Sequence, residues 1–322
     1  MINAARFIWG SLDRIIMCMS HNERMLNGPG GLDFGRVRGD LIFRCGARPG
    51  GVGSRCRIIA DDRNSDDFNL QYENNHADFI KWNLYSTVLT RHLSLVPDFD
   101  MFSSAPDSRW PTCHALLRAL SPGPTFLSDL PGTPTDSAIL ARLEATDRSG
   151  ESKVVKMDIP AAIPSVRWFW DNIQGEGEGP GLVAVAPAPG SQGALIAIWN
   201  VRDAGNGGLV RDRIGMDELV DAAGKELTSE HILWRVGMDS QPTWGLVTPV
   251  WGGIEVQVEK ESCELFVLAP VSEVGGIKVA VLGMLDKYAP LAGMRVTQDT
   301  GECLCAWRLV ESDILINRRL DN

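Results

Sequence analysis

A change in sequence pattern near residue 145 constrains the fold of this chain more than any other feature. Before this point, stretches with apolar residues at helical intervals pass into short apolar runs, as over residues 76–96. Such alternation predicts helices that cover buried, parallel β-strands. After it, short β-rich segments are separated by Gly and Pro turns, which predicts an antiparallel β-sandwich with few helices. We therefore predict an α/β domain over residues 1–145 and an all-β domain over residues 146–322.

The α/β half contains repeated helix-then-strand units. Residues 1–20 form the first unit and end in the apolar run IIMCMS. The second joins a helix over 76–93 to a strand over 93–96, and the third joins CHALLRAL at 113–120 to TFL at 125–127. Carboxylates follow the later strands, at Asp98, Asp100 and Asp129. Carboxylates just past strand ends are typical of the catalytic rim of an α/β barrel.

Residues 21–62 interrupt this pattern. The segment is rich in Gly and Arg and has only weak periodicity. A structureless insert of this length is unusual inside a compact domain. We interpret it as a loop, a disordered segment or an error in the gene model, and it forms an unmatched insert within the α/β domain.

Charge and apolar content argue against two classes of partner. The formal net charge is −10, the pI is about 5.0, and no Lys- and Arg-rich run is interleaved with aromatic residues. We therefore expect no nucleic-acid partner. No run of about 18 or more apolar residues is present, so we expect neither a membrane span nor a secretory signal. These features predict a cytoplasmic protein.

Two further motifs have a structural interpretation. The seven Cys are scattered without a C-x-x-C pair, as expected of buried free thiols in a reducing compartment. Cys303 and Cys305 would share one face of a strand and could hold a metal, but two core thiols are the favoured interpretation. The glycines of GEGEGPG, residues 175–181, have neither Rossmann nor P-loop spacing, which favours a flexible hairpin loop.

The densest polar cluster is RNSDDF, at residues 63–68. It places two adjacent carboxylates, Asp66 and Asp67, beside the guanidinium of Arg63. Such neighbours can set the pKa of a general acid. A helix N-cap or a solvated turn is the structural alternative, and the run taken alone favours it.

A second acidic cluster is VPDFDMF, in which Asp98 and Asp100 flank Phe99. In an extended chain the two carboxylates face the same side. One of them could bind sugar hydroxyls while Phe99 or Phe102 stacks on a sugar ring. A structural turn is the alternative interpretation, and the motif taken alone favours it.

The third candidate is the pair His114 and Arg118, which are one helical turn apart. Helical spacing puts both basic groups on one face, where they could hold a carboxylate such as Asp129 or a ligand hydroxyl. A structural ion pair is an equal alternative.

Taken together and in this order, RNSDDF, VPDFDMF and HALLRALSPGPTFLSDLPG resemble the C-terminal barrel half of glycoside hydrolase family 36. The most similar branch contains raffinose synthases, seed imbibition proteins and alkaline α-galactosidases, and its fungal members in particular. IIMCMS resembles the strand before the acid/base segment, and GALIAIWNV and VAVLGMLDK resemble strands of the family's sandwich. The resemblance covers residues 1–20 and 63–290. It implies the C-terminal part of a (βα)8 TIM barrel followed by an antiparallel β-sandwich.

The resemblance implies a retaining α-galactosidase or galactosyltransferase that acts on α-galactoside oligosaccharides with no metal or organic cofactor. Such enzymes use a nucleophilic carboxylate and an acid/base carboxylate about 5–5.5 Å apart. By the family's motif the acid/base is Asp67, with Asp66 as the alternative. The implied substrate-binding residues are Arg63, Asp98, Asp100, His114, Arg118 and Asp129.

The sequence departs from the family at the nucleophile. The family's Lys-x-Asp motif lies on an earlier barrel strand, whereas no Lys-x-Asp precedes RNSDDF here, and the KMD at residues 156–158 lies in the sandwich portion. Losing the nucleophile removes most of the rate of a double displacement, so we expect a very poor glycosidase. Two further departures are Phe99 in place of the usual Trp, and Pro122 in a usual Gly-Gly pair.

Three hypotheses follow. The first is an α-galactosidase or raffinose synthase relative that is truncated at its N-terminus, with an incomplete barrel whose open edges require a partner or mark a degenerate product. The second is a non-catalytic carbohydrate-binding or interaction protein derived from that family. The third is a pseudogene product without a function. The sequence specifies no oligomeric state.

Overall fold

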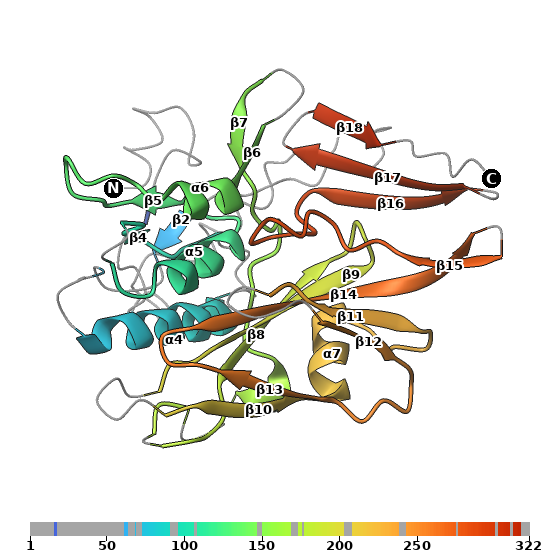
Figure 1. Cartoon of the computed structure of the whole chain (residues 1–322), viewed down its shortest axis with the longest axis horizontal. Helices are drawn as coiled ribbons and strands as arrows, with labels where there is room; N and C mark the ends of the chain where they lie inside the picture. Colours follow the sequence, from blue (N-terminus) through green and yellow to red (C-terminus); the bar gives the residue numbers. More distant parts are fainter. Residues whose placement is uncertain are drawn as a thin grey trace, which may run out of the picture.

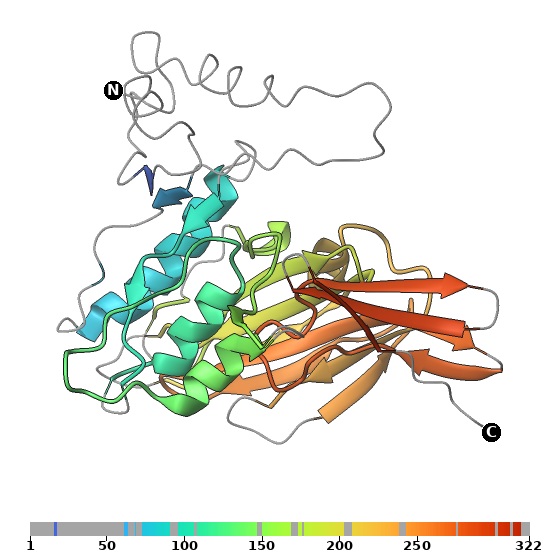
Figure 2. The same cartoon turned by 90° about the horizontal axis from the view of Figure 1, so that it is seen from above.

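The computed structural model describes residues 16–17, 61–63, 68, 73–90, 96–105, 108–146, 150–168, 173–175, 177–202, 208–237, 243–274, 276–299, 302–309 and 312–316. Figure 1 shows a helical region in blue and green beside a larger region of β-sheets in yellow to red, and Figure 2 shows the same arrangement from above. The predictions for Asp66, Asp67, residues 21–60 of the insert at 21–62 and the side chains of Cys303 and Cys305 fall outside the described residues. The last two residues of that insert, Asp61 and Asp62, lie in a β-strand.

The helical region also contains short parallel strands. β1 (Ile16–Met17), β2 (Asp61–Arg63) and β3 (Val96–Asp98) form one sheet in that order, and β4 (Met101–Phe102) pairs with β5 (Phe126–Leu127). Parallel pairing agrees with the predicted alternation of helices and strands, because parallel neighbours require a crossover connection. Within the described residues these strands do not close into a barrel. The (βα)8 barrel therefore stays a prediction.

Helices cover these strands on one side of the molecule. They are α4 (Glu73–Thr90), α5 (Pro111–Ala119) and α6 (Ser137–Leu143). The first two confirm the predicted helices, and α4 buries Ile80 and Leu84 completely. α5 begins at Pro111, whose fixed φ suits the first turn of a helix. The sequence pattern did not predict α6, which is capped by Asp136: the Asp136 Oδ1 accepts the N–H of Ala138 at 2.7 Å.

The β region is built on one large antiparallel sheet, with strand order β12-β11-β14-β9-β8 and with β15 paired to β14. Its strands are β8 (Leu182–Ala188), β9 (Gly193–Trp199), β11 (His231–Arg235), β12 (Thr243–Val247), β14 (Cys263–Val274) and β15 (Ile277–Ala280). β9 is buried at every residue because both faces of the sheet are covered. This double coverage explains why GALIAIW is a continuous apolar run without alternation.

Two layers cover the large sheet. On one face pack β10 (Val210–Ile214), β13 (Ile254–Val258) and α7 (Met216–Ala223), and on the other face pack α4, α5 and α6. The remaining strands also pair antiparallel. β6 (Glu144–Thr146) pairs with β7 (Ser152–Val154), and a three-stranded sheet has the order β16 (Met294–Asp299), β17 (Glu302–Leu309) and β18 (Ser312–Ile316). The predicted antiparallel strands are therefore confirmed. None of the described helices has the length and hydropathy that crossing a bilayer requires.

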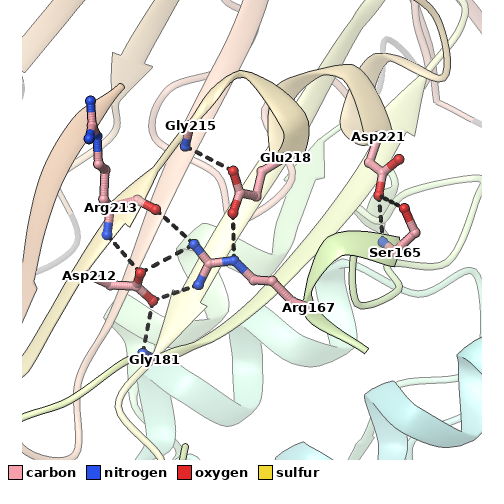
Figure 3. Close-up of polar contacts among 8 residues, drawn as sticks. All are labelled: Ser165, Arg167, Gly181, Asp212, Arg213, Gly215, Glu218 and Asp221. Carbon is pink, nitrogen blue, oxygen red and sulfur yellow. Dashed lines mark hydrogen bonds and ion pairs between the residues drawn. The ribbon is translucent and has the colours of Figure 1, made fainter. Parts of the chain in front are cut away.

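A buried ion-pair network fixes the layer of α7 and β10, as Figure 3 shows. Arg167 lies on the 3-10 helix η2 (Ser165–Arg167). Its Nη1 donates to Asp212 Oδ2 at 2.6 Å, its Nε donates to Glu218 Oε1 at 2.7 Å, and its Nη2 donates to the carbonyl of Arg213 at 2.7 Å. Asp212 also accepts the N–H of Gly181 at 3.0 Å. One guanidinium therefore joins η2, β10, α7 and the start of β8.

The helical region and the large sheet share one hydrophobic core, in which buried residues of α4 and α5 pack with buried residues of β8, β9 and β14. Polar contacts cross the same junction. Arg109 forms an ion pair with Glu261, and Trp199 Nε1 donates to the carbonyl of Cys113 at 3.1 Å. Trp110 and Glu261 both adopt left-handed φ angles, of 61° and 58°. The predicted domain boundary near residue 145 falls in β6, and the division into two domains stays a prediction.

Candidate functional site

The sequence motifs meet at the carboxyl ends of the parallel strands. In the register of β2 and β3, Arg63 is the partner of Asp98, so the first residue of RNSDDF lies beside VPDFDMF. Asp129 follows the end of β5. Asp66 and Asp67 lie outside the described residues, as does the side chain of Arg63. The described part of the site therefore consists of Asp98, Asp100, His114, Arg118 and Asp129 with their neighbours.

Asp98 and Asp100 form a turn rather than an extended chain. The N–H of Asp100 donates to Asp98 Oδ1 at 2.8 Å, and Asp100 adopts a left-handed φ of 56°. Aspartate tolerates this region better than most residues, because its short side chain can bond the local backbone. The prediction that the two carboxylates face the same side of an extended chain is therefore wrong. Asp100 Oδ2 instead accepts the N–H of Phe68 at 2.9 Å, and both side chains are buried.

The aromatic rings of this motif belong to the core. Phe99 and Phe102 are both almost fully buried and pack in the main hydrophobic cluster. The guanidinium carbon of Arg118 lies 5.2 Å from the centroid of the Phe102 ring. The prediction that one of these rings stacks on a sugar is wrong in this structure, because neither presents an open face. Only a rearrangement of the core would expose them.

Arg118 binds backbone carbonyls at the strand ends. Its side chain is fully buried; Nη2 donates to the carbonyl of Met101 at 2.8 Å, and Nε donates to that of Asp100 at 3.3 Å. Burial lowers the pKa of Arg118 to about 9, and the carboxylates of Asp100 and Asp98 partly oppose this shift. The guanidinium thus fixes the backbone of the VPDFDMF motif, and it does not hold the carboxylate of Asp129.

His114 links Arg118 to a histidine that the sequence analysis missed. Arg118 Nη1 lies 2.9 Å from His114 Nδ1, and His114 Nε2 lies 2.9 Å from His76 Nδ1 on α4. A guanidinium can only donate, so His114 Nδ1 accepts and its Nε2–H donates to His76. His76 was detectable as a polar residue three and four positions before Phe79 and Ile80 on the apolar face of a helix.

His114 should make stability depend on pH. Burial, with the nearby charges of Arg118 and His76, lowers its pKa well below the ordinary 6.5. Below pH 6.5, His114 therefore binds a proton in the unfolded chain but not in the folded chain. The stability that depends on neutral His114 is fully present above that pH and decreases as the pH falls.

We expect the unfolding free energy to fall by about 2 kcal/mol between pH 7 and pH 5 because of His114. Urea titrations of the wild type and of His114→Gln at both pH values measure it. The variant should lose correspondingly less stability on acidification; equal losses would contradict the prediction.

Asp129 has partners of its own. Its Oδ1 accepts from Ser103 Oγ at 2.7 Å, from Ser104 N at 2.7 Å and from Ala105 N at 3.0 Å, and its Oδ2 accepts from Ser104 Oγ at 2.7 Å. Burial alone would raise the pKa of this carboxyl, but the hydrogen bonds from Ser103, Ser104 and Ala105 outweigh burial and lower it. Asp129 therefore stays ionised and orders the segment after β4. The prediction that it is held by His114 and Arg118 is wrong.

The described residues of this site order the strand ends. Asp98, Asp100 and Arg118 are buried, and the hydrogen bonds above commit them to backbone groups of neighbouring segments. Within the described part of the chain, no group of three or more His, Cys, Asp or Glu residues is arranged to hold a metal ion. The acid/base role expected of Asp67 or Asp66 stays a prediction, because both residues lie outside the described part of the chain. The substrate-binding roles expected of Arg63, Asp98, Asp100, His114, Arg118 and Asp129 stay predictions.

A surface groove with a volume of about 380 Å³ lies away from these motifs. It is lined by Ile163, Pro164, Ser165, Val185, Val220, Asp221, Gly224 and Lys225. These residues lie in or next to η2, β8 and α7 and include no residue of the three motifs. Figure 3 shows two of them, Ser165 and Asp221, joined by hydrogen bonds. The groove therefore does not mark the predicted site.

Comparison with known proteins gives weak, partial similarities. No family model and no curated protein matches the chain. Among solved structures, α-galactosidase I from Mortierella vinacea is 13% identical with a TM-score of 0.41, over 65% of this chain and 52% of that one. An α-galactosidase from Saccharomyces cerevisiae is 11% identical with a TM-score of 0.39, over 65% and 59%.

A GH27 β-L-arabinopyranosidase from Geobacillus stearothermophilus, in complex with arabinose, is 13% identical with a TM-score of 0.42, over 80% of this chain and 58% of that one. The chain thus spans between 52% and 59% of the length of these three solved structures. These three partly similar structures are two α-galactosidases and a β-L-arabinopyranosidase.

Proposed function

We propose that this chain is a glycoside-hydrolase-type protein of the α-galactosidase and raffinose synthase branch, which binds α-galactoside oligosaccharides and has little or no turnover by itself. Three sequence motifs carry the resemblance to that family. The observation that supports the proposal most is that these motifs, which are distant in sequence, converge in space at the ends of parallel strands.

The convergence rests on specific contacts. Phe68, the last residue of RNSDDF, donates its N–H to Asp100 Oδ2 of VPDFDMF. Arg118 of the third motif donates to the carbonyls of Asp100 and Met101. Asp129, at the end of the third motif, accepts from the residues after β4. A catalytic rim of an α/β barrel requires such proximity of residues from successive strand ends.

The chemistry proposed for this rim is that of a retaining glycosidase. Asp67 would be the acid/base, with Asp66 as the alternative, and the second carboxylate would be a nucleophile. No Lys-x-Asp precedes RNSDDF in this sequence, so no residue here matches the family's nucleophile. The proposed consequence is impaired or absent double displacement.

A non-catalytic carbohydrate-binding protein is the second candidate function. The observation that favours it is that Asp98 and Asp100, the described carboxylates nearest to RNSDDF, are buried and take part in local hydrogen bonds. Neither is placed to attack a sugar carbon. The two candidates differ in turnover and agree on binding.

Hydrolysis of a chromogenic α-galactoside by the purified chain, together with a calorimetric titration with raffinose, tests both. We expect raffinose to bind and maltose not to bind, with turnover near the uncatalysed rate. Any residual turnover should be lost in Asp67→Asn, because a general acid contributes about 10²–10⁴-fold to the rate.

Asp66→Asn tests the alternative acid. Asp286→Asn is the matched control, because Asp286 is exposed and forms an ion pair with the adjacent Lys287. Failure to bind any α-galactoside would overturn the proposal. Turnover that survives Asp67→Asn and Asp66→Asn would overturn the assignment of the acid.

A further inference from the structure

The edge strand β12 is the least protected edge of the large sheet. Among the described residues it pairs with β11 alone. Its sequence, TWGLV, contains no charge and no Pro. Trp244 is 64% exposed and Leu246 is 43% exposed. A regular, apolar edge strand presents unpaired N–H and C=O groups and is a template for pairing with another strand.

The other edges of the sheet carry protection that β12 lacks. At β8, Ala162 and Val185 exchange backbone hydrogen bonds of 3.0 and 2.9 Å, so part of that edge is already paired. β8 also contains Pro187, which has no N–H to donate. β15 is short and carries Lys278. Charge, Pro and coverage are the devices by which natural sheets block edge-to-edge contact.

The sequence of β12 is complementary to itself. In an antiparallel pair of two β12 strands centred on Gly245, Trp244 lies opposite Leu246 of the second copy, and Thr243 lies opposite Val247. A two-fold symmetric contact requires such complementarity of a surface with itself. Each copy would therefore cover the exposed aromatic ring of the other with an aliphatic side chain.

The neighbouring strand extends this apolar surface. Trp244 is the register partner of Trp234, and Leu246 is the partner of Ile232, so the four side chains form one row on the same face. The whole chain has a net charge of −10, which opposes association between copies. β12 has no charged residue, so a contact centred on it avoids like charges facing each other across the symmetry axis.

We propose that two copies of this chain associate through β12, in antiparallel register about Gly245, to form one continuous sheet across the dimer. Because the two-fold symmetric pairing occupies β12 of both copies, a third copy cannot add at this edge, and the assembly stops at a dimer. The proposal concerns the β region and does not depend on the proposed carbohydrate function.

Gly245 allows the register itself to be tested. A Cβ built on Gly245 would meet nothing within 4 Å in the single chain, so a side chain here disturbs no contact of the fold. In the dimer this position faces its own copy, with Cβ atoms about 4.5–5.5 Å apart. Gly245→Asp and Gly245→Lys each place like charges opposite each other, whereas Gly245→Ala places two methyl groups there.

The experiment is sedimentation equilibrium of the full chain over a range of concentrations. We expect the wild type and Gly245→Ala to be dimers, and Gly245→Asp and Gly245→Lys to dimerise at least about tenfold more weakly. An equimolar mixture of the Asp and Lys variants should restore the dimer, because opposite charges then face each other. Only this register predicts the restoration.

Three outcomes would overturn the proposal. The first is a wild type that remains monomeric at concentrations of about 100 μM, which would mean that β12 does not pair with a second copy. The second is a dimer that both charged variants retain, which places the contact elsewhere. The third is a mixture that stays monomeric although circular dichroism shows both variants folded, which excludes pairing about Gly245.

Discussion

Arg167→Met should destabilise the protein by about 3–5 kcal/mol, because it removes the one cation from a buried network and leaves two carboxylates behind. The side chains of Arg167, Asp212 and Glu218 are 2%, 4% and 8% exposed. Met fills a similar volume but cannot donate to Asp212, to Glu218 or to the carbonyl of Arg213. Unfolding free energies from urea titration at pH 7 measure the loss.

Arg211→Met is the matched control for this prediction. Arg211 lies on β10 beside Asp212, and its Nε is 3.0 Å from Glu178 Oε2, but the two side chains are 56% and 59% exposed. An exposed pair of this kind contributes less than about 1 kcal/mol. Losses of equal size in the two variants would mean that burial does not strengthen the Arg167 network.

Gly123→Ala should cost about 3 kcal/mol or more, because a methyl group at this position overlaps the end of β3. A Cβ on Gly123 would lie 2.1 Å from the carbonyl oxygen of Pro97. The site is also fixed by hydrogen bonds: Gly123 N donates to Ser121 Oγ at 3.1 Å, and Lys156 Nζ donates to the Gly123 carbonyl at 2.7 Å. Relief of the overlap requires β3 to move.

A shift of β3 carries Asp98 and Asp100 with it, so the same variant should also weaken binding of raffinose. Gly245→Ala is the control, since its Cβ would meet no atom within 4 Å and its unfolding free energy should change by less than about 1 kcal/mol. Urea titration and calorimetry give the two measurements. A stable Gly123→Ala protein would show that the backbone near Pro97 can relax without cost.

Local sequence pattern predicted the helices and strands best where burial is regular. α4 and α5 place apolar residues at helical spacing, and β9 is a continuous apolar run between turns, so each element could be recognised by itself. β10 was missed, although its alternation of buried and exposed residues is the pattern of a half-covered strand. The short helix α6 was missed because seven residues carry little periodicity.

The site was harder to predict because its contacts come from distant segments. An extended reading of VPDFDMF failed at Asp100, whose left-handed conformation accompanies hydrogen bonds to Asp98 and to Phe68, 32 residues earlier. The spacing of His114 and Arg118 correctly placed them together. It could not reveal that the guanidinium binds the carbonyls of Asp100 and Met101, since backbone partners leave no trace in a sequence pattern.

The junction between Arg109 and Glu261 has a consequence for the evolution and engineering of this protein. Trp110 and Glu261 adopt left-handed conformations that cost non-glycine residues free energy and persist only when the surroundings hold them. The segment that begins α5 and the turn before β14 hold each other through this ion pair. The β region therefore cannot be removed without loss of this contact. A sandwich from another protein, fused after α6, would have to reproduce this turn to keep α5, with His114 and Arg118, in its present orientation.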